Sequence, residues 1–130
     1  MLMNLKNRPL TAEFLVAFFL VGVPHWLTPY NKTSAAGVII GGMLIAAVAA
    51  VARLRIPAAR FSGITRAAAL AMPAAALARV IVETTMVDPT SHNLWPFEIA
   101  AALLLGYAGA IPGALLGSLL GRFKKNKNLA

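Results

Sequence analysis

Four long apolar segments constrain what this chain can fold into. They cover about residues 10–29, 34–52, 67–87 and 96–121 of the 130. A helix needs about 20 mostly apolar residues to cross the hydrocarbon core of a bilayer. Apolar residues make up 59% of the chain, above the roughly 45–50% usual for soluble domains. The sequence therefore predicts an all-α, polytopic membrane protein in which residues 1–130 form a single domain of four transmembrane helices.

The basic residues predict the orientation of these helices. Ten of them lie before the first segment, between the second and third, and after the fourth, whereas the other two loops hold only Lys32. Because cytoplasmic loops are enriched in Lys and Arg, we expect both termini, the 53–66 loop and a basic tail over 122–130 to be cytoplasmic. The ten residues are Lys6, Arg8, Arg53, Arg55, Arg60, Arg66, Arg122, Lys124, Lys125 and Lys127.

This topology also accounts for the net charge of +8, so no nucleic-acid partner is expected. The expected location is the inner, cytoplasmic membrane of a bacterium, and the expected partners are the lipid bilayer and either a second copy or another membrane protein. A cleaved signal peptide is the alternative reading of the first segment. Glu13 within that segment, and Pro24 and His25 near its end, argue against cleavage.

A short repeat places aromatic residues in the two loops expected outside. His25-Trp26-Leu27-Thr28-Pro29-Tyr30 and His92-Asn93-Leu94-Trp95-Pro96-Phe97 share the pattern His-x-Leu-x-Pro-aromatic. Interface aromatics anchor membrane helices, which is one interpretation of both copies. The same offset aligns Gly42, Ala46 and Ala50 with Gly109, Gly113 and Gly117, which suggests a parallel repeat of two helices.

The fourth segment carries a row of small residues that favours close helix packing. Residues four apart share one helical face, and this row consists of Gly109, Gly113, Gly117 and Gly121. In lipid, such faces let two backbones approach closely. The row can pack within its own bundle, or it can meet a second subunit or partner protein. We favour the second, because a second row of small residues lies beside it, and two rows exceed what one neighbouring helix needs. The second row consists of Ala102, Gly106, Ala110, Ala114 and Ser118.

Arg79 and Glu83 form the most costly polar pair expected inside the membrane. They lie one turn apart in the third segment, where a charge at the helix centre costs about 2.5–3.5 kcal/mol. Two interpretations remain open. The pair either marks a substrate or proton path inside the bundle, or Arg79 extends outward, pairs with Glu83 and only fixes helix packing.

The remaining ionisable residues give weaker signals. Glu13 and Glu98 each follow a proline near a segment start, so helix capping is the favoured interpretation of both. His25, His92 and Asp88 are weak metal-ligand candidates, with interface anchoring as the preferred alternative. No cofactor is expected, and the chain has no cysteine.

These features favour a non-enzymatic protein. No nucleophile motif, phosphate loop or metalloprotease helix occurs in the sequence. The favoured function is a structural or accessory subunit that associates through the glycine-rich fourth helix. The alternative is a small oligomeric transporter or channel with an intramembrane polar site at Arg79 and Glu83.

Overall fold

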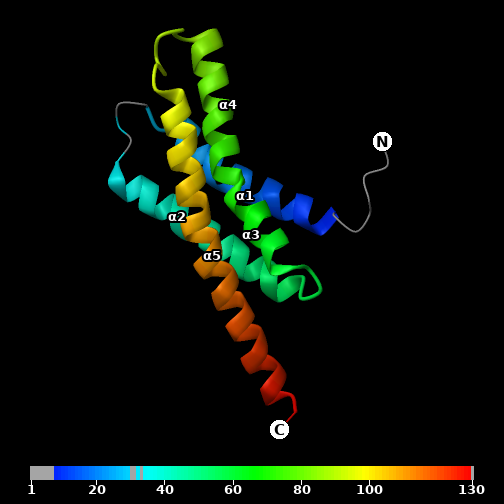
Figure 1. The fold of residues 1–130 in the computed structure, drawn as a ribbon. Helices are drawn as coiled ribbons and strands as arrows, with labels where there is room; N and C mark the ends of the chain where they lie inside the picture. The colour runs from blue at the N-terminus through cyan, green and yellow to red at the C-terminus, as the bar shows by residue number, and fades with distance from the viewer. Residues whose placement is uncertain (1–7, 30–31, 33, 130) are drawn as a thin grey trace.

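The structure is a computed structural model that describes residues 8–29, 32 and 34–129, and over these residues it consists of helices without strands (Figure 1). Lys6 and Tyr30, named above, lie outside the described residues. In chain order the helices are α1 Arg8–Leu27, α2 Ala35–Arg55, α3 Phe61–Ala69, α4 Ala71–Met86 and α5 Trp95–Lys127. Four stretches are long and apolar enough to cross a membrane: Pro9–Leu27, Ala35–Arg55, Phe61–Met86 and Trp95–Lys127.

The expected 53–66 loop is much shorter in the structure. α2 continues to Arg55 and stops at Ile56, whose φ of −124° and ψ of 62° are not helical. Because Ile56 precedes Pro57, the helical conformation is disfavoured there. α3 then begins at Phe61, with Ile64 buried and Arg66 exposed. An arginine fits the charge pattern equally well on an exposed helical face and in a loop. The sequence pattern therefore misplaced this boundary.

The third predicted segment, 67–87, is divided at Leu70. Pro73 has no N–H, so the carbonyl of Ala69 loses its helical hydrogen-bond donor. That carbonyl faces α5, where a Cβ added to Gly106 would lie 2.2 Å from the Ala69 oxygen. Only a glycine fits at this contact, and the break in the helix is thus packed against α5.

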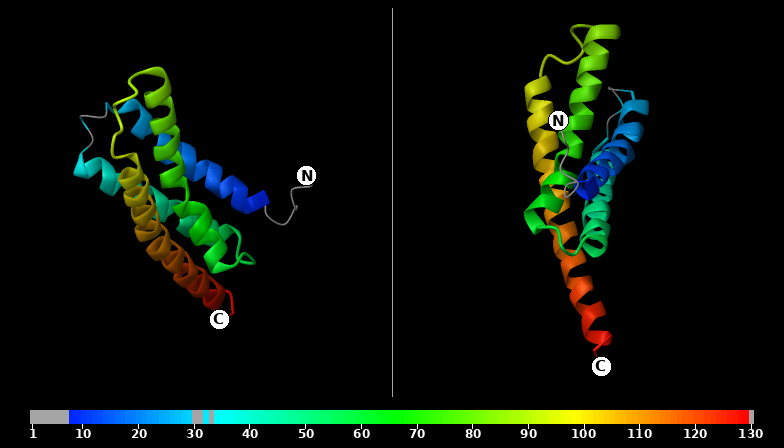
Figure 2. Two further views of the ribbon diagram at one scale, coloured as in Figure 1. Left: turned by 45° about the horizontal axis from the view of Figure 1, so that its top comes forward. Right: turned by 90° about the vertical axis from the view of Figure 1, so that its right-hand side faces the viewer.

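The predicted 122–130 tail is mostly helical. α5 has 33 residues and ends at Lys127 rather than at Gly121. At 1.5 Å per residue its length is about 50 Å, which exceeds a hydrocarbon core of about 30 Å. Lys124, Lys125 and Lys127 occupy the last turn, where cations complement the helix dipole. The far end of α5 projects beyond the other helices (Figures 1 and 2).

Small side chains make up most of the core. Alanines from all five helices are buried, and the largest fully buried side chains are those of Ile45 and Ile64. Large apolar side chains such as Phe19, Ile39 and Leu104 are instead exposed. This distribution suits helices that approach closely through small residues and present their large side chains to lipid.

Candidate functional site

The glycine row of α5 packs against α2 of the same chain. A Cβ added to Gly109 would lie 2.5 Å from the Gly42 oxygen, and one added to Gly113 would lie 2.2 Å from the Ala46 oxygen. At Gly117 the added atom would lie 2.5 Å from the Ala50 oxygen. Both residue numbers increase together along the contact, so the two helices run parallel.

These contacts favour the interpretation that the row packs within its own bundle. Gly109, Gly113 and Gly117 are buried by the backbone of α2, which leaves no room for another helix at these positions. Gly121 differs, because an added Cβ would meet only Leu54 Cδ2 at 3.7 Å. The paired residues are those aligned by the 67-residue offset that relates His25 to His92, so aligned positions of the two suggested repeats face each other.

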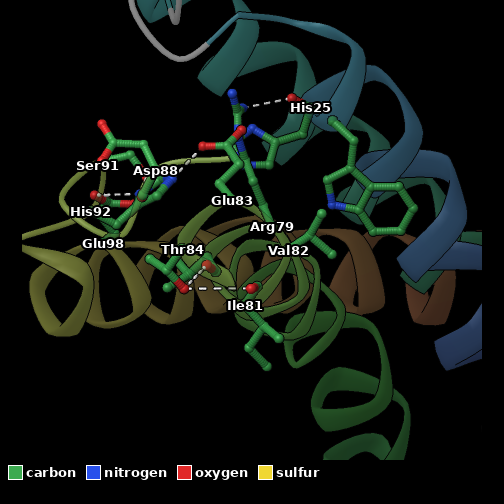
Figure 3. A network of polar contacts seen from close by, with 12 residues as sticks. His25, Arg79, Ile81, Val82, Glu83, Thr84, Asp88, Ser91, His92 and Glu98 are labelled. Atoms are coloured by element: carbon green, nitrogen blue, oxygen red, sulfur yellow. Dashed lines mark hydrogen bonds and ion pairs between the residues drawn. The ribbon is translucent and has the colours of Figure 1, made fainter. Parts of the chain in front are cut away.

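A polar cluster of Arg79, Glu83, His92 and Glu98 joins α1, α4 and α5 (Figure 3). Arg79 Nε donates to Glu83 Oε1 at 2.7 Å. Its two terminal nitrogens donate to the carbonyl oxygens of His25 at 2.7 Å and Thr28 at 2.8 Å. These carbonyls lie at the end of α1, where a cation both satisfies unpaired acceptors and complements the helix dipole. Arg79 is only 5% exposed, and it pairs with Glu83 and joins α4 to α1, as the interpretation of a packing role requires.

His92 connects the two carboxylates of the cluster. Its Nε2 lies 2.5 Å from Glu83 Oε2, and its Nδ1 lies 2.9 Å from Glu98 Oε2. The two ring nitrogens therefore hold the carboxyl groups of α4 and α5 together. Glu98 lies in the first turn of α5, as expected, but its side chain contacts His92.

The other residues singled out near the loops lie apart from this cluster, except that His25 contributes its backbone carbonyl to it. Asp88 is exposed, and its Oδ1 accepts from the backbone N–H and the hydroxyl of Thr90. These two hydrogen bonds lower the pKa of Asp88 below its ordinary value. Pro29 follows α1, and Pro96 is in the first turn of α5. In the described part of the chain, no group of three or more His, Cys, Asp or Glu residues could hold a metal ion.

A groove of about 270 Å³ lies beside the cluster, between α1, α2 and α4. Near the α1–α2 loop it is lined by His25, Thr28, Lys32 and Ser34. Farther along the helices its lining is apolar, including Val21, Gly41 and Met72. A Cβ added to Gly41 would lie 3.4 Å from Met72 Cε and 3.9 Å from Val21 Cγ1, so the groove is narrow at this inner end.

Glu13 is buried on α1, the helix that lines one side of this groove, but it does not itself line the groove. It lies one helical turn from Ala17 and two turns from Val21, the groove-lining residue of α1 that is nearest to it in the sequence. Glu13 is 6% exposed and Ala17 is fully buried. Both carboxyl oxygens of Glu13 are buried without a hydrogen-bond partner. Because α1 begins at Arg8, Glu13 lies beyond the first turn, and the prediction that it caps this helix is wrong.

Sequence reasoning therefore missed two features of the site. The groove depends on how α1, α2 and α4 meet, which no local pattern reveals. The position of Glu13 inside the first apolar segment was visible in the sequence, but its burial without a partner was not. Comparison of the chain with protein-family models, with curated proteins and with solved structures finds no match.

Proposed function

We propose that the protein is a small membrane transporter, in which a small solute or ion enters by the groove and moves along α1. The observation that carries this proposal is that α1 both lines the groove and holds an unpaired, buried carboxyl group, that of Glu13. By the distribution of basic residues, we place the mouth of the groove on the non-cytoplasmic side.

The lack of any structural partner for Glu13 supports this function. Ionisable residues inside membrane helices are costly, and those that persist commonly serve substrate or ion pathways. Arg79 and Glu83 hold α1 to α4 and thereby have a structural explanation. Glu13 has none among the described residues, since neither of its oxygens is hydrogen-bonded. We therefore assign the path to Glu13 and a positioning role to the polar cluster.

Glu13 does not line the groove in this structure, so transport requires a movement at the inner end of the groove. Val21 and Met72 lie at that end, and methionine side chains rearrange easily. Pro24 interrupts α1 beside the groove, and Pro73 follows the break between α3 and α4. Prolines are common positions of helix bending. We propose that bending at these two positions opens the inner end.

The accessory role is less well supported than it was from the sequence. Its main argument was a free glycine face on α5, and α2 of the same chain covers three of those glycines. The large apolar side chains that remain exposed are spread over the helices, as expected for contact with lipid.

Purified protein in lipid vesicles tests the transport function. Gradients of protons, potassium, acetate, glycerol and urea are applied, and their decay is followed by an internal pH dye, by a potassium-sensitive dye and by light scattering. Gly41→Leu fills the groove, and Gly37→Leu narrows it nearer the mouth. Ala47→Leu is the matched control, because it makes the same kind of change on an exposed face of α2.

We expect wild type and Ala47→Leu to accelerate the decay of at least one gradient, and both groove variants to slow it. Circular dichroism checks that each variant remains helical. No acceleration over protein-free vesicles would overturn the proposal, as would equal rates in the groove variants and the control. If gentle purification brings down a stoichiometric, unrelated membrane protein, and the protein alone is inactive in vesicles, the accessory role would be restored.

A further inference from the structure

We infer that Glu13 is a proton-binding site that holds its proton in the closed structure and exchanges it through the groove. This inference rests on the transport function proposed above, and it names the proton as the coupling ion. It is carried by the enclosure of the carboxyl group, by the absence of a partner and by its place on α1, which also lines the groove.

The surroundings of Glu13 accommodate a neutral acid better than a carboxylate. Glu13 lies four residues, about 6 Å at 1.5 Å per residue, inside the Pro9–Leu27 span. The same face of α1 continues with Ala17 and Val21, both part of the apolar core. Burying an unpaired ionised carboxyl group in such surroundings is far more costly than burying the acid. Release of the proton therefore requires that water or a cation reach the site.

No described charged side chain on the helices packed against α1 hydrogen-bonds or ion-pairs with Glu13. On α2, Arg53 donates to Ser118 Oγ at 3.0 Å and to the Ala59 carbonyl at 2.6 Å. On α4, Arg79 and Glu83 belong to the polar cluster. The other charged residues of these segments are exposed, and they are Arg55, Arg60 and Arg66. The site therefore has no built-in counter-charge among the described residues.

The same lack of partners favours a proton over a metal cation. Metal cations of the alkaline-earth type bind through several oxygen ligands at once. The Glu13 oxygens have no second polar group within hydrogen-bond distance. The buried hydroxyl of Thr65 on α3 is engaged with the Phe61 carbonyl at 3.0 Å. A proton needs only one carboxylate oxygen, which is what this site supplies.

The chemical step is a simple proton transfer. A hydronium ion in the opened groove gives its proton to a carboxylate oxygen of Glu13 and becomes water, and the reverse transfer releases the proton. No other bond changes. Since Glu13 is buried and does not line the groove, exchange must follow a movement that connects the two.

Infrared difference spectroscopy of the full chain in lipid tests the inference directly. The chain has only four Asp and Glu residues, so the carbonyl stretch of a protonated side-chain acid can be assigned by substitution. We expect such a band near neutral pH in wild type and its loss in Glu13→Gln. Glu13→Asp should retain a shifted band, which separates loss of the acid from loss of the fold. Asp88→Asn, at an exposed carboxyl, is the matched control and should retain the band.

Transfer to D2O reports exchange. We expect the band to shift, and to shift more slowly in Gly41→Leu than in Ala47→Leu. A band unchanged by Glu13→Gln would overturn the inference even if the vesicles transport a solute. A band that does not shift in D2O would also overturn it. Loss of the band in Glu13→Gln with normal exchange, but with no gradient dissipated by wild type, would uphold the proton site and refute the transport function.

Discussion

Gly113→Ala should destabilise the protein because the backbone of α2 occupies the position of the new methyl group. The added Cβ would lie 2.2 Å from the Ala46 oxygen and 2.6 Å from its Cα. Carbon–oxygen contacts of this kind normally measure about 3.3 Å, so the helices must separate by about 1 Å. Overpacking of this sort costs roughly 1–3 kcal/mol. Alanine stabilises a helix by about 0.5–1 kcal/mol relative to glycine. With overpacking at the upper end of its range, the unfolding free energy should therefore fall by about 2 kcal/mol.

Gly121→Ala is the matched control on the same row of α5. Its added Cβ would meet Leu54 Cδ2 at 3.7 Å, an ordinary contact. The free energy of unfolding should therefore stay level or rise by up to about 1 kcal/mol. Reversible unfolding in mixed micelles, followed by circular dichroism, measures both variants, and size-exclusion chromatography reports their oligomeric state.

Equal stability of Gly113→Ala and Gly121→Ala would refute the packing of α2 on α5. A Gly113→Ala variant that dissociates an oligomer, with the unfolding free energy of the monomer unchanged, would also refute it. That second result would return the glycine row to a contact between subunits.

Three further predictions concern contacts at the end of the bundle that holds the polar cluster. Arg79→Gln leaves Glu83 and two α1 carbonyls without their cation and should cost about 3–5 kcal/mol in unfolding free energy; adding Glu83→Gln should recover part of that loss in a double-mutant cycle. Trp26→Phe removes the Nε1 donor to the Ala75 carbonyl, 3.0 Å away, and should cost about 1 kcal/mol in the same assay. Thr90→Val removes one of two donors and should raise the pKa of Asp88 toward 3.8, as measured by NMR. Because the pKa of Asp88 is lowered in the fold, its contribution to stability is present above pH 3.8 and is lost as the pH falls through the lower, folded value.

Much of the helical architecture could be predicted because lipid imposes a strong length rule. α1 and α2 begin and end within three residues of the predicted segments, Leu10 to Pro29 and Ser34 to Ala52. Ser34 also serves as a helix cap, accepting from the N–H of Gly37 at 3.2 Å. The start of the third segment and the end of the fourth were harder to predict, since Arg66 and Lys124 are compatible with either a helix or a loop.

The candidate site could be predicted only in part, for a physical reason. Spacing of four residues shows which side chains share a face, and so Arg79 and Glu83 could be expected to pair. It does not show which helix that face meets. The same limit applies to Gly113, which was expected to meet a partner and packs against α2. It also applies to Glu13, which was expected at a helix start and is buried. His92 joined Glu83 and Glu98 through a loop whose course no periodicity describes.

Water access to the groove is the most direct test of the account, because transport along α1 depends on it. The chain has no cysteine, so single cysteines can be introduced without a background reaction. Gly41→Cys lines the groove and Ala47→Cys faces outward on the same helix. We predict that a membrane-impermeant thiol reagent labels Gly41→Cys from one side of the vesicle and leaves Ala47→Cys unlabelled in lipid. Labelling of Ala47→Cys alone, or of neither position, would contradict the groove as the entrance to the site.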